Sequence, residues 1–68
     1  LNEKEELVKS SSVKIHDNVF IGANTTILKG VTIGSGAVVA AGSIVVKNVR
    51  PKTLVAGNPA EEKKTIQN

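Results

Sequence analysis

Residues 15–50 read IHDNVF, IGANTT, ILKGVT, IGSGAV, VAAGSI and VVKNVR, six consecutive six-residue units in one register. Repetition at a fixed short interval specifies an architecture as well as local structure. The first position of every unit is a β-branched aliphatic residue, which favours a strand. These first-position residues are Ile15, Ile21, Ile27, Ile33, Val39 and Val45.

The fourth position of every unit is glycine or asparagine, and the fifth is always small or of modest size. Glycine and asparagine accept a positive φ at little cost, and a chain that turns a corner after each short strand needs that conformation. The repeat therefore predicts short strands separated by tight corners, rather than a valine-rich region with scattered turns. The fourth-position residues are Asn18, Asn24, Gly30, Gly36, Gly42 and Asn48. The fifth-position residues are Val19, Thr25, Val31, Ala37, Ser43 and Val49.

Three strands and three corners in each turn of the chain would place residue i above residue i+18. Ile15 then stacks on Ile33, the first and fifth columns point inward, and successive coils hydrogen-bond at about 4.8 Å. We therefore expect an all-β chain, a triangular parallel β-solenoid of about two coils. Repeat stacks generally need at least three units and protected ends. Two coils thus imply either a piece of a larger protein or an oligomer.

Stacking also sorts the second hexad positions onto three edges of the solenoid. The edges carry His16 and Gly34, Gly22 and Ala40, and Leu28 and Val46. The edge of small residues lets a ligand approach the backbone closely. The edge of Leu28 and Val46 exposes apolar side chains, and the outward-facing Phe20, Val38 and Ile44 add to this surface. Contiguous exposed apolar surface predicts contact between subunits.

The composition limits the class of protein. With 68 residues the chain is at most one small domain, and it contains no cysteine for disulfides or thiolate metal sites. The net charge is +3, but the charges lie mainly in two flanks of mixed sign. No basic stripe alternates with stacking aromatics, so we expect no nucleic-acid partner. The sequence has no apolar run of about 18 residues, and no n-region or h-region marks a signal peptide, so we expect no membrane partner and a cytoplasmic location.

The repeat divides the chain into three parts. Residues 1–12 predict a loop or a helical flank, residues 13–50 the β-solenoid, and residues 51–68 a C-terminal extension. Within the extension, we expect one further short extended segment from Thr53 to Ala56.

A short helix is expected after this piece. Asn58 is a suitable N-cap, Pro59 suits the first helical position, and Glu61 is placed to complete a capping box. Such a helix would cover the open end of the last coil and blunt the unpaired sheet edge.

The ordered elements NVFIGAN, GVTIG, AAGSIVVK and AGNPA make residues 13–64 resemble the C-terminal part of hexapeptide-repeat acyltransferases. The resemblance is closest to the maltose and galactoside O-acetyltransferase group. It implies a left-handed parallel β-helix, assembled as a homotrimer through its faces. It also implies transfer of acetyl from acetyl-CoA to a hydroxyl of a sugar or similar small acceptor. The left hand comes only from the resemblance, since parallel crossovers are generally right-handed.

The resemblance also implies residues that contact acetyl-CoA. Ala23 and Ala41 match positions where the pantetheine arm approaches the backbone of the coils. Lys47 and Lys64 match basic residues near the nucleotide phosphates, and Val46 replaces a threonine at the nucleotide end. The alternative interpretation of the two lysines is ordinary solvated surface.

Phe20 stands where the family usually has a tryptophan lining the acceptor pocket, with a subunit contact as the alternative role. Glu61 replaces a frequent lysine or arginine, which would weaken phosphate binding. The general base of the family is a histidine upstream of these hexads, so we expect no catalytic residue in this chain. His16, the only histidine, is expected to be a solvated corner residue, with a relocated base as the alternative. One histidine doesn't make a metal site, which needs three or more ligands, so no metal is expected.

Together these features predict that the chain is the C-terminal portion of an acetyl-CoA-dependent O-acetyltransferase. The 68-residue chain alone is expected to be inactive. The alternative is a non-catalytic β-helix module for trimerisation or scaffolding. The absent base and the apolar edge of Leu28 and Val46 favour that alternative.

Overall fold

Eight strands and no helix make up residues 12–67, the part of the chain that the computed structural model describes. Each hexad contributes one two-residue strand, and two longer strands follow the repeat. Nearly all of the predicted N-terminal flank lies outside the described residues. The strands are β1 (Lys14–Ile15), β2 (Phe20–Ile21), β3 (Thr26–Ile27), β4 (Thr32–Ile33), β5 (Val38–Val39), β6 (Ile44–Val45), β7 (Thr53–Gly57) and β8 (Ala60–Thr65).

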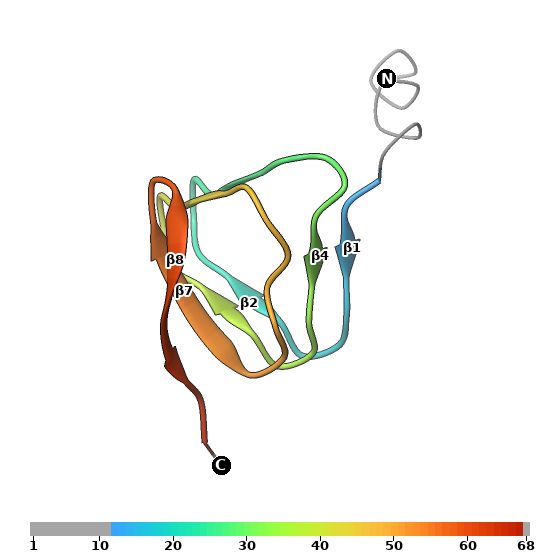
Figure 1. Ribbon diagram of the computed structural model, residues 1–68, viewed down its shortest axis with the longest axis vertical. Helices are drawn as coiled ribbons and strands as arrows, with labels where there is room; N and C mark the ends of the chain where they lie inside the picture. The colour runs from blue at the N-terminus through green and yellow to red at the C-terminus, as the bar shows by residue number, and fades with distance from the viewer. Residues whose placement is uncertain (1–11, 68) are drawn as a thin grey trace.

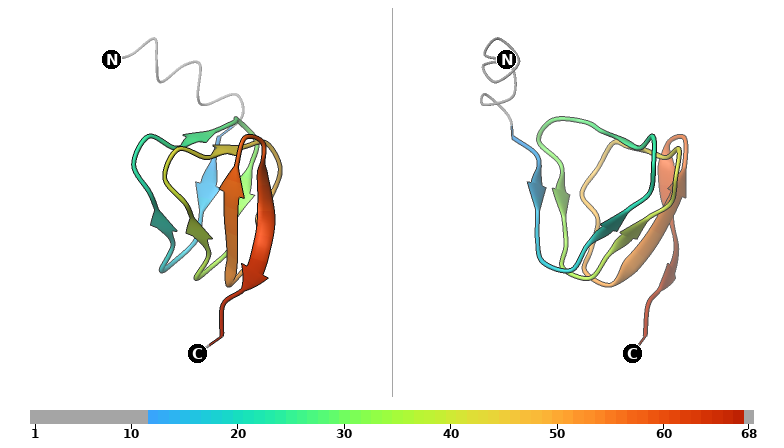
Figure 2. Two further views of the ribbon diagram at one scale, coloured as in Figure 1. Left: turned by 90° about the vertical axis from the view of Figure 1, so that its left-hand side faces the viewer. Right: turned by 180° about the vertical axis from the view of Figure 1, so that it is seen from behind.

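The hexad strands form three short sheets, each containing every third strand of the chain (Figure 1). β1 pairs with β4, β2 with β5, and β3 with β6, all in parallel. Ile15 lies beside Ile33, so the predicted offset of 18 residues is confirmed. The chain thus passes through three faces and returns beside its own start, which makes two stacked coils (Figure 2).

The fourth hexad position supplies the corners, as predicted, in five of the six units. Five of these residues have a positive φ, from 60° at Asn24 to 84° at Gly30. Asn48 is the exception, because the chain shortens at its corner and the next positive φ, 52°, falls at Lys52.

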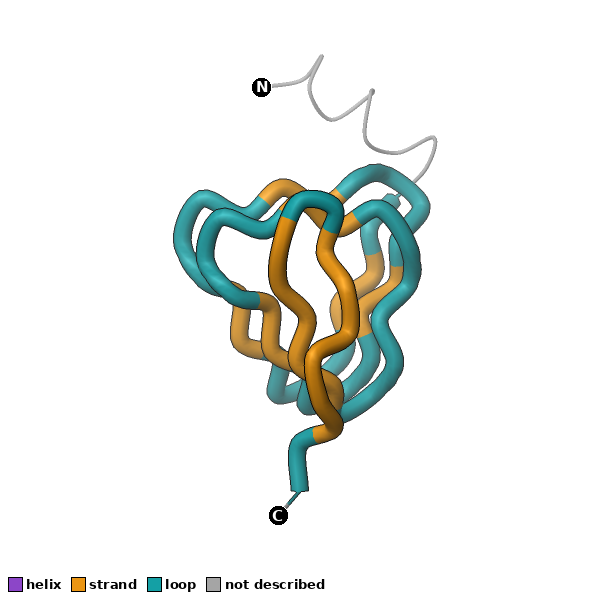
Figure 3. Tube along the Cα trace, turned by 60° about the vertical axis from the view of Figure 1, so that its left-hand side comes forward, coloured by secondary structure: helices purple, strands orange, loops and turns teal. Residues whose placement is uncertain are grey.

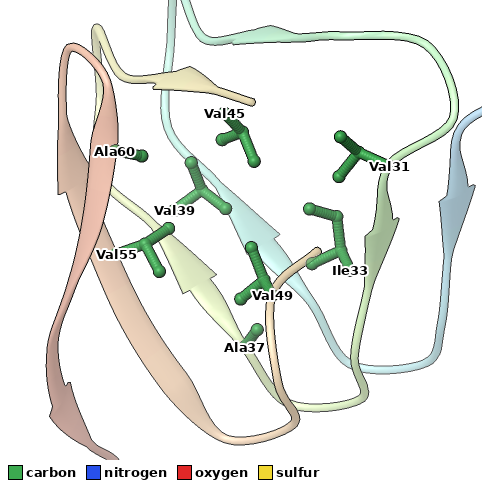
Figure 4. Packing of buried hydrophobic residues seen from close by; sticks show 8 residues of the cluster. All are labelled: Val31, Ile33, Ala37, Val39, Val45, Val49, Val55 and Ala60. Atoms are coloured by element: carbon green, nitrogen blue, oxygen red, sulfur yellow. The ribbon is translucent and has the colours of Figure 1, made fainter. Parts of the chain in front are cut away.

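The first and fifth hexad columns point inward and form the core of the second coil (Figure 4). Ile33, Val39 and Val45 are 0%, 0% and 1% exposed. In the first coil the same column is less buried, and Ile15 is 48% exposed, because only one coil stacks on it. The other buried apolar residues are Val31, Ala37, Val49, Val55 and Ala60.

The second coil is two residues shorter than the first, because its last corner, between Val45 and Val49, is shortened. A third, incomplete coil begins at Val49. β7 joins the sheet of β2 and β5 with Val55 beside Val39, an offset of 16 residues. An isolated bridge on the β1–β4 face has the same offset. At the shortened corner the side-chain Oδ1 of Asn48 accepts a 2.8 Å hydrogen bond from the main-chain N–H of Thr32. The Asn48 side chain therefore supplies the hydrogen-bond acceptor for a main-chain N–H of β4 at this corner.

The C-terminal extension contains two strands. The extended piece predicted at Thr53–Ala56 is confirmed as part of β7, but the helix predicted after Asn58 is wrong. The chain reverses at Asn58 and Pro59, and β8 returns antiparallel alongside β7 (Figure 3). Ala60 is buried in the core and β7 offers an edge for pairing, whereas a helix of about six residues has little stability of its own. β8 therefore takes over the covering role that was expected of the helix.

Candidate functional site

Ala23 and Ala41 lie on the same corner of consecutive coils, between the β2–β5 face and the β3–β6 face. The main-chain N–H of Gly42 donates a 2.9 Å hydrogen bond to the carbonyl of Ala23, which joins the two coils here. Both alanines are exposed. Gly22 permits the close spacing, since a Cβ atom on it would lie 2.5 Å from the main-chain nitrogen of Ala41. The corner therefore presents backbone and methyl groups that a thin ligand can approach closely.

The hydroxyl groups of Ser43 and of the half-buried Thr25 hold this corner from the inside. Ser43 is fully buried, and its Oγ donates a 2.7 Å hydrogen bond to the carbonyl of Ala40. The same Oγ accepts a 3.3 Å hydrogen bond from the N–H of Gly57 in the third coil. One coil earlier, Thr25 Oγ1 donates to the carbonyls of Gly22 at 2.9 Å and of Ala40 at 3.3 Å. These bonds link all three coils, so the corner has a well-anchored support.

A pocket of about 400 Å³ lies between β6, the shortened corner and the β7–β8 hairpin. Its lining combines core side chains with polar residues at the rim. The lining residues are Val45, Lys47, Asn48, Val49, Val55, Ala60, Glu61 and Glu62. Lys47, the predicted phosphate ligand, therefore shares its pocket with two carboxylates.

Arg50 and Glu62 tie β8 to the shortened corner beside this pocket. The Arg50 guanidinium donates two hydrogen bonds, Nε to Oε2 at 2.9 Å and Nη2 to Oε1 at 2.7 Å. The hydrogen bond from Arg50 lowers the pKa of Glu62, and the charge of Lys47 lowers it slightly further. Among residues 12–67, Glu61 takes part in no ion pair. Glu61 is thus the unneutralised carboxylate of the pocket.

Phe20 and Lys64 lie at opposite ends of one row of outward side chains on the β2–β5–β7–β8 sheet. The pairing places Phe20 beside Val38, Val38 beside Leu54, and Leu54 beside Lys64. Three strand spacings separate the two ends, about 14 Å. Phe20 is 64% exposed. The row is apolar except at Lys64.

The remaining corners hold the other residues singled out in the sequence. Val46 and Leu28 are 42% and 43% exposed on the third edge, as the stacking predicted. His16 is exposed, and its main-chain N–H donates to the carbonyl of Ile33. Within residues 12–67, no three histidine or carboxylate side chains gather to hold a metal ion, and no helix is long and apolar enough to cross a membrane. The structure thus brings Ala23 and Ala41 together on one corner, keeps Val46 and Lys47 on another, and places Phe20 and Lys64 on one sheet face.

Two features of the site were not predicted. Ser43 interrupts an otherwise aliphatic stretch of the inward column, and a buried hydroxyl in that column signals a hydrogen bond to the backbone. The pairing of Arg50 with Glu62 had no such signal, because it depends on β8 folding back as a strand.

Over residues 12–47 the sequence matches the family described as bacterial transferase hexapeptide (six repeats). The chain belongs to this hexapeptide transferase family. The matched segment contains nearly all of the six units defined by the register, and the resemblance inferred from them is confirmed.

Known acetyltransferases are similar to the chain in sequence and in structure. The 2,3,4,5-tetrahydropyridine-2,6-dicarboxylate N-acetyltransferase of Staphylococcus aureus is 56% identical over 52 residues, which is 76% of this chain and 22% of that protein. The maltose O-acetyltransferase of Clostridium difficile has a TM-score of 0.82 at 46% identity, covering 85% of this chain and 31% of that one. A hexapeptide-repeat acetyltransferase of Vibrio cholerae, complexed with acetyl coenzyme A, has a TM-score of 0.83 at 45% identity, covering 85% and 32%.

The chain spans about a fifth to a third of the length of these transferases. They include both N- and O-acetyltransferases, so acetyl transfer is what they share and the acceptor is what differs. The family's β-helix fold agrees with the stacked parallel coils described above.

Proposed function

We propose that this chain forms the C-terminal β-helix of an acetyl-CoA-dependent O-acetyltransferase, with a left-handed coil and a homotrimeric assembly. The main support is the corner of Ala23 and Ala41, where exposed alanines of two consecutive coils lie on one edge and a main-chain hydrogen bond joins the coils. A relative of 45% identity, whose structure is similar over 85% of this chain, is complexed with acetyl coenzyme A.

In this proposal the pantetheine arm lies along the alanine corner, and the nucleotide end lies toward the last coil. Small side chains there leave room for the arm, and Gly22 keeps the two coils close enough to form one surface. Lys47 and Lys64 attract the phosphates, while Val46 contributes an apolar contact at the nucleotide end. Glu61 opposes Lys47 within the same pocket, so phosphate affinity is limited on this side.

The chemistry requires a base outside these residues. An acceptor hydroxyl loses its proton to the base as its oxygen attacks the thioester carbonyl, and the CoA thiolate leaves. The only histidine, His16, lies on a different corner from Ala23 and Ala41. The chain therefore binds the acetyl donor without turning it over, and Phe20 on the neighbouring face contacts a sugar or similar small acceptor.

Calorimetric titration of the 68-residue chain with CoA tests this proposal. We expect measurable binding at millimolar ligand, weakened about fivefold by Lys47→Ala through loss of a charged phosphate contact. Lys29→Ala is the matched control, because Lys29 occupies the same corner one coil earlier. Glu61→Gln should strengthen binding, and Ala41→Leu should weaken it by obstructing the corner. Absence of binding by a folded chain, or equal effects of the two lysine substitutions, would contradict the proposal.

A non-catalytic trimerisation module is the second candidate. The outward row of Phe20, Val38 and Leu54 favours it, as do the exposed Leu28 and Val46. A chain that trimerises in sedimentation experiments but does not bind CoA would support the module over the transferase.

A further inference from the structure

β8 forms the outer edge of the four-stranded sheet. The strand order is β2-β5-β7-β8, so among residues 12–67 β8 has β7 as its only neighbour (Figure 2). Residues 61–65 are all exposed. An unpaired strand edge is a template for another strand, and proteins normally protect such edges with charged side chains or bulges. β8 has both, and their arrangement is specific.

Two antiparallel copies of β8 would place opposite charges beside each other. The strand reads AEEKKT, two carboxylates followed by two ammonium groups. When two copies run antiparallel about a dyad between Glu62 and Lys63, Glu61 faces Lys64 and Glu62 faces Lys63. A shift of one or two residues in either direction places two glutamates or two lysines opposite each other, which is destabilising. The charges therefore admit one register of self-pairing and oppose its neighbours.

The hydrogen bonds of β7 show which way the groups of β8 point. The carbonyl of Val55 accepts a 3.0 Å hydrogen bond from the N–H of Ala40, so Val55 faces β5. Since neighbouring residues in a strand face opposite edges, Leu54 and Ala56 face β8. A 2.7 Å bond from the N–H of Ile66 to the carbonyl of Lys52 continues this alternation.

The partners of Leu54 and Ala56 are Lys64 and Glu61, which therefore face β7. Between Glu61 and Lys64 stand two residues, Glu62 and Lys63, where β7 has only Val55. This is the register shift of the pairing, a β-bulge. Because of the bulge, the main-chain groups of the residues on either side of Glu61 and Lys64 point toward the same edge of β8.

Ala60 precedes Glu61, and Thr65 follows Lys64, so both direct their main-chain groups away from β7. They are five residues apart, and in a regular strand they would face opposite edges. In antiparallel pairing, two facing residues both direct their main-chain N–H and C=O groups toward the partner strand, or both direct them away. A regular strand whose dyad falls between two residues cannot pair with a copy of itself, because one facing residue would point toward the partner and the other away. The bulge corrects this, so that Ala60 of one copy can exchange main-chain hydrogen bonds with Thr65 of the other.

We propose that β8 is a self-recognition edge that pairs antiparallel with β8 of a second copy of this chain. The contact is isologous, with each Glu61–Lys64 pair occurring twice. It joins two coil stacks end to end and continues the sheet from one copy into the next. It is small, since one six-residue strand pair lies well below the area of a standard stable interface. A single pair therefore associates weakly, and an assembly with several such edges associates more strongly.

Glu61 and Lys64 provide the test, because Glu62 already binds Arg50. Glu61→Lys or Lys64→Glu alone places like charges opposite each other twice, which should weaken self-association at least about fivefold. An equimolar mixture of these two variants should restore association, since each copy then meets opposite charges. The double variant E61K/K64E is the matched control, with the wild-type net charge and restored self-complementarity.

Sedimentation velocity over a concentration series, without CoA, measures each case, and circular dichroism checks that each variant is folded. For wild type, the mixture and the double variant, we expect the mass of the sedimenting species to double as the concentration rises. The single variants should reach the doubled mass only at higher concentration. Added salt should weaken the wild-type contact. The proposal would be overturned if the wild-type mass does not double, or if the single variants associate as strongly as wild type. It would also be overturned if mixing the two single variants does not restore association. None of these outcomes depends on CoA binding.

Discussion

Two glycines on one corner of the coil stack serve different purposes, and exchanging each for alanine should separate them. Gly22 occupies the second hexad position, where a Cβ atom would lie 2.5 Å from the nitrogen and 2.7 Å from the Cα of Ala41. Gly42 occupies the fourth position with φ of 76°, and a Cβ atom there would meet nothing within 4 Å. The first glycine is needed for space and the second for backbone conformation.

The expected magnitudes follow from these geometries. In Gly42→Ala the only penalty is a left-handed conformation for an L-residue, about 1–2 kcal/mol. In Gly22→Ala the new methyl group meets backbone, which cannot rotate away, so the coils must separate. Overpacking typically costs about 1–3 kcal/mol, and we expect the upper end of that range or more. Gly42→Asn should be nearly neutral, because Asn18 and Asn24 adopt φ of 62° and 60° in the same column.

Urea unfolding followed by circular dichroism, at one fixed protein concentration, measures the three variants. The expected order of the free energy of unfolding is Gly42→Asn above Gly42→Ala, with Gly22→Ala lowest. A Gly22→Ala variant as stable as Gly42→Ala, or an asparagine at position 42 no better than alanine, would contradict these expectations. Either result would mean that the coils tolerate a wider spacing than the hydrogen bonds at this corner indicate.

Three further predictions concern the core, the shortened corner and the edge strand. Ile33→Ala should destabilise the chain by about 2–5 kcal/mol, and Ile15→Ala by much less because Ile15 is half exposed; equal losses in chemical unfolding would contradict the stacking. Asn48→Ala should cost about 1 kcal/mol by removing a hydrogen-bond acceptor, and Asn48→Asp, which keeps the oxygen, should cost less in the same assay. Arg50 holds the pKa of Glu62 below its ordinary value of 4.5, so the pair stabilises the fold above that pH and its contribution disappears as the pH falls through the lowered pKa. Thermal melts from pH 7 to 3 should therefore show a smaller acid loss for Glu62→Gln than for wild type.

The repeat was sufficient to predict the coils, because each hexad position has a fixed geometric meaning. An aliphatic residue every six positions sets the strands, and the Gly or Asn column sets the corners, so the 18-residue offset followed from counting. The shortening at Asn48 could not be seen, since asparagine fits both a positive φ and a side-chain hydrogen bond. The C-terminal strand was missed because Asn58, Pro59 and Glu61 satisfy local rules for a helix start. Pairing with β7 and burial of Ala60 outweighed those local preferences.

The candidate site was predictable only where it depends on stacking. Ala23 and Ala41 are 18 residues apart, so the repeat itself places them together. The surroundings of Lys47 were not predictable in this way, because Glu61 and Glu62 reach its pocket through the β7–β8 hairpin. The charge balance of the pocket thus depends on the one element for which local sequence was misleading.

The difference between Ile15 and Ile33 shows where the stability of the stack resides. Both are isoleucine, both occupy the first hexad position, and they pair directly with each other, yet one is 48% exposed and the other fully buried. Position in the repeat fixes the direction of a side chain, whereas the number of adjacent coils fixes its burial. The second coil, with a neighbour on each side, therefore provides most of the core. The alanine corner is built on the hydrogen bonds between the first and second coils and on Ser43, so a ligand bound there would contact the best-supported part of the chain.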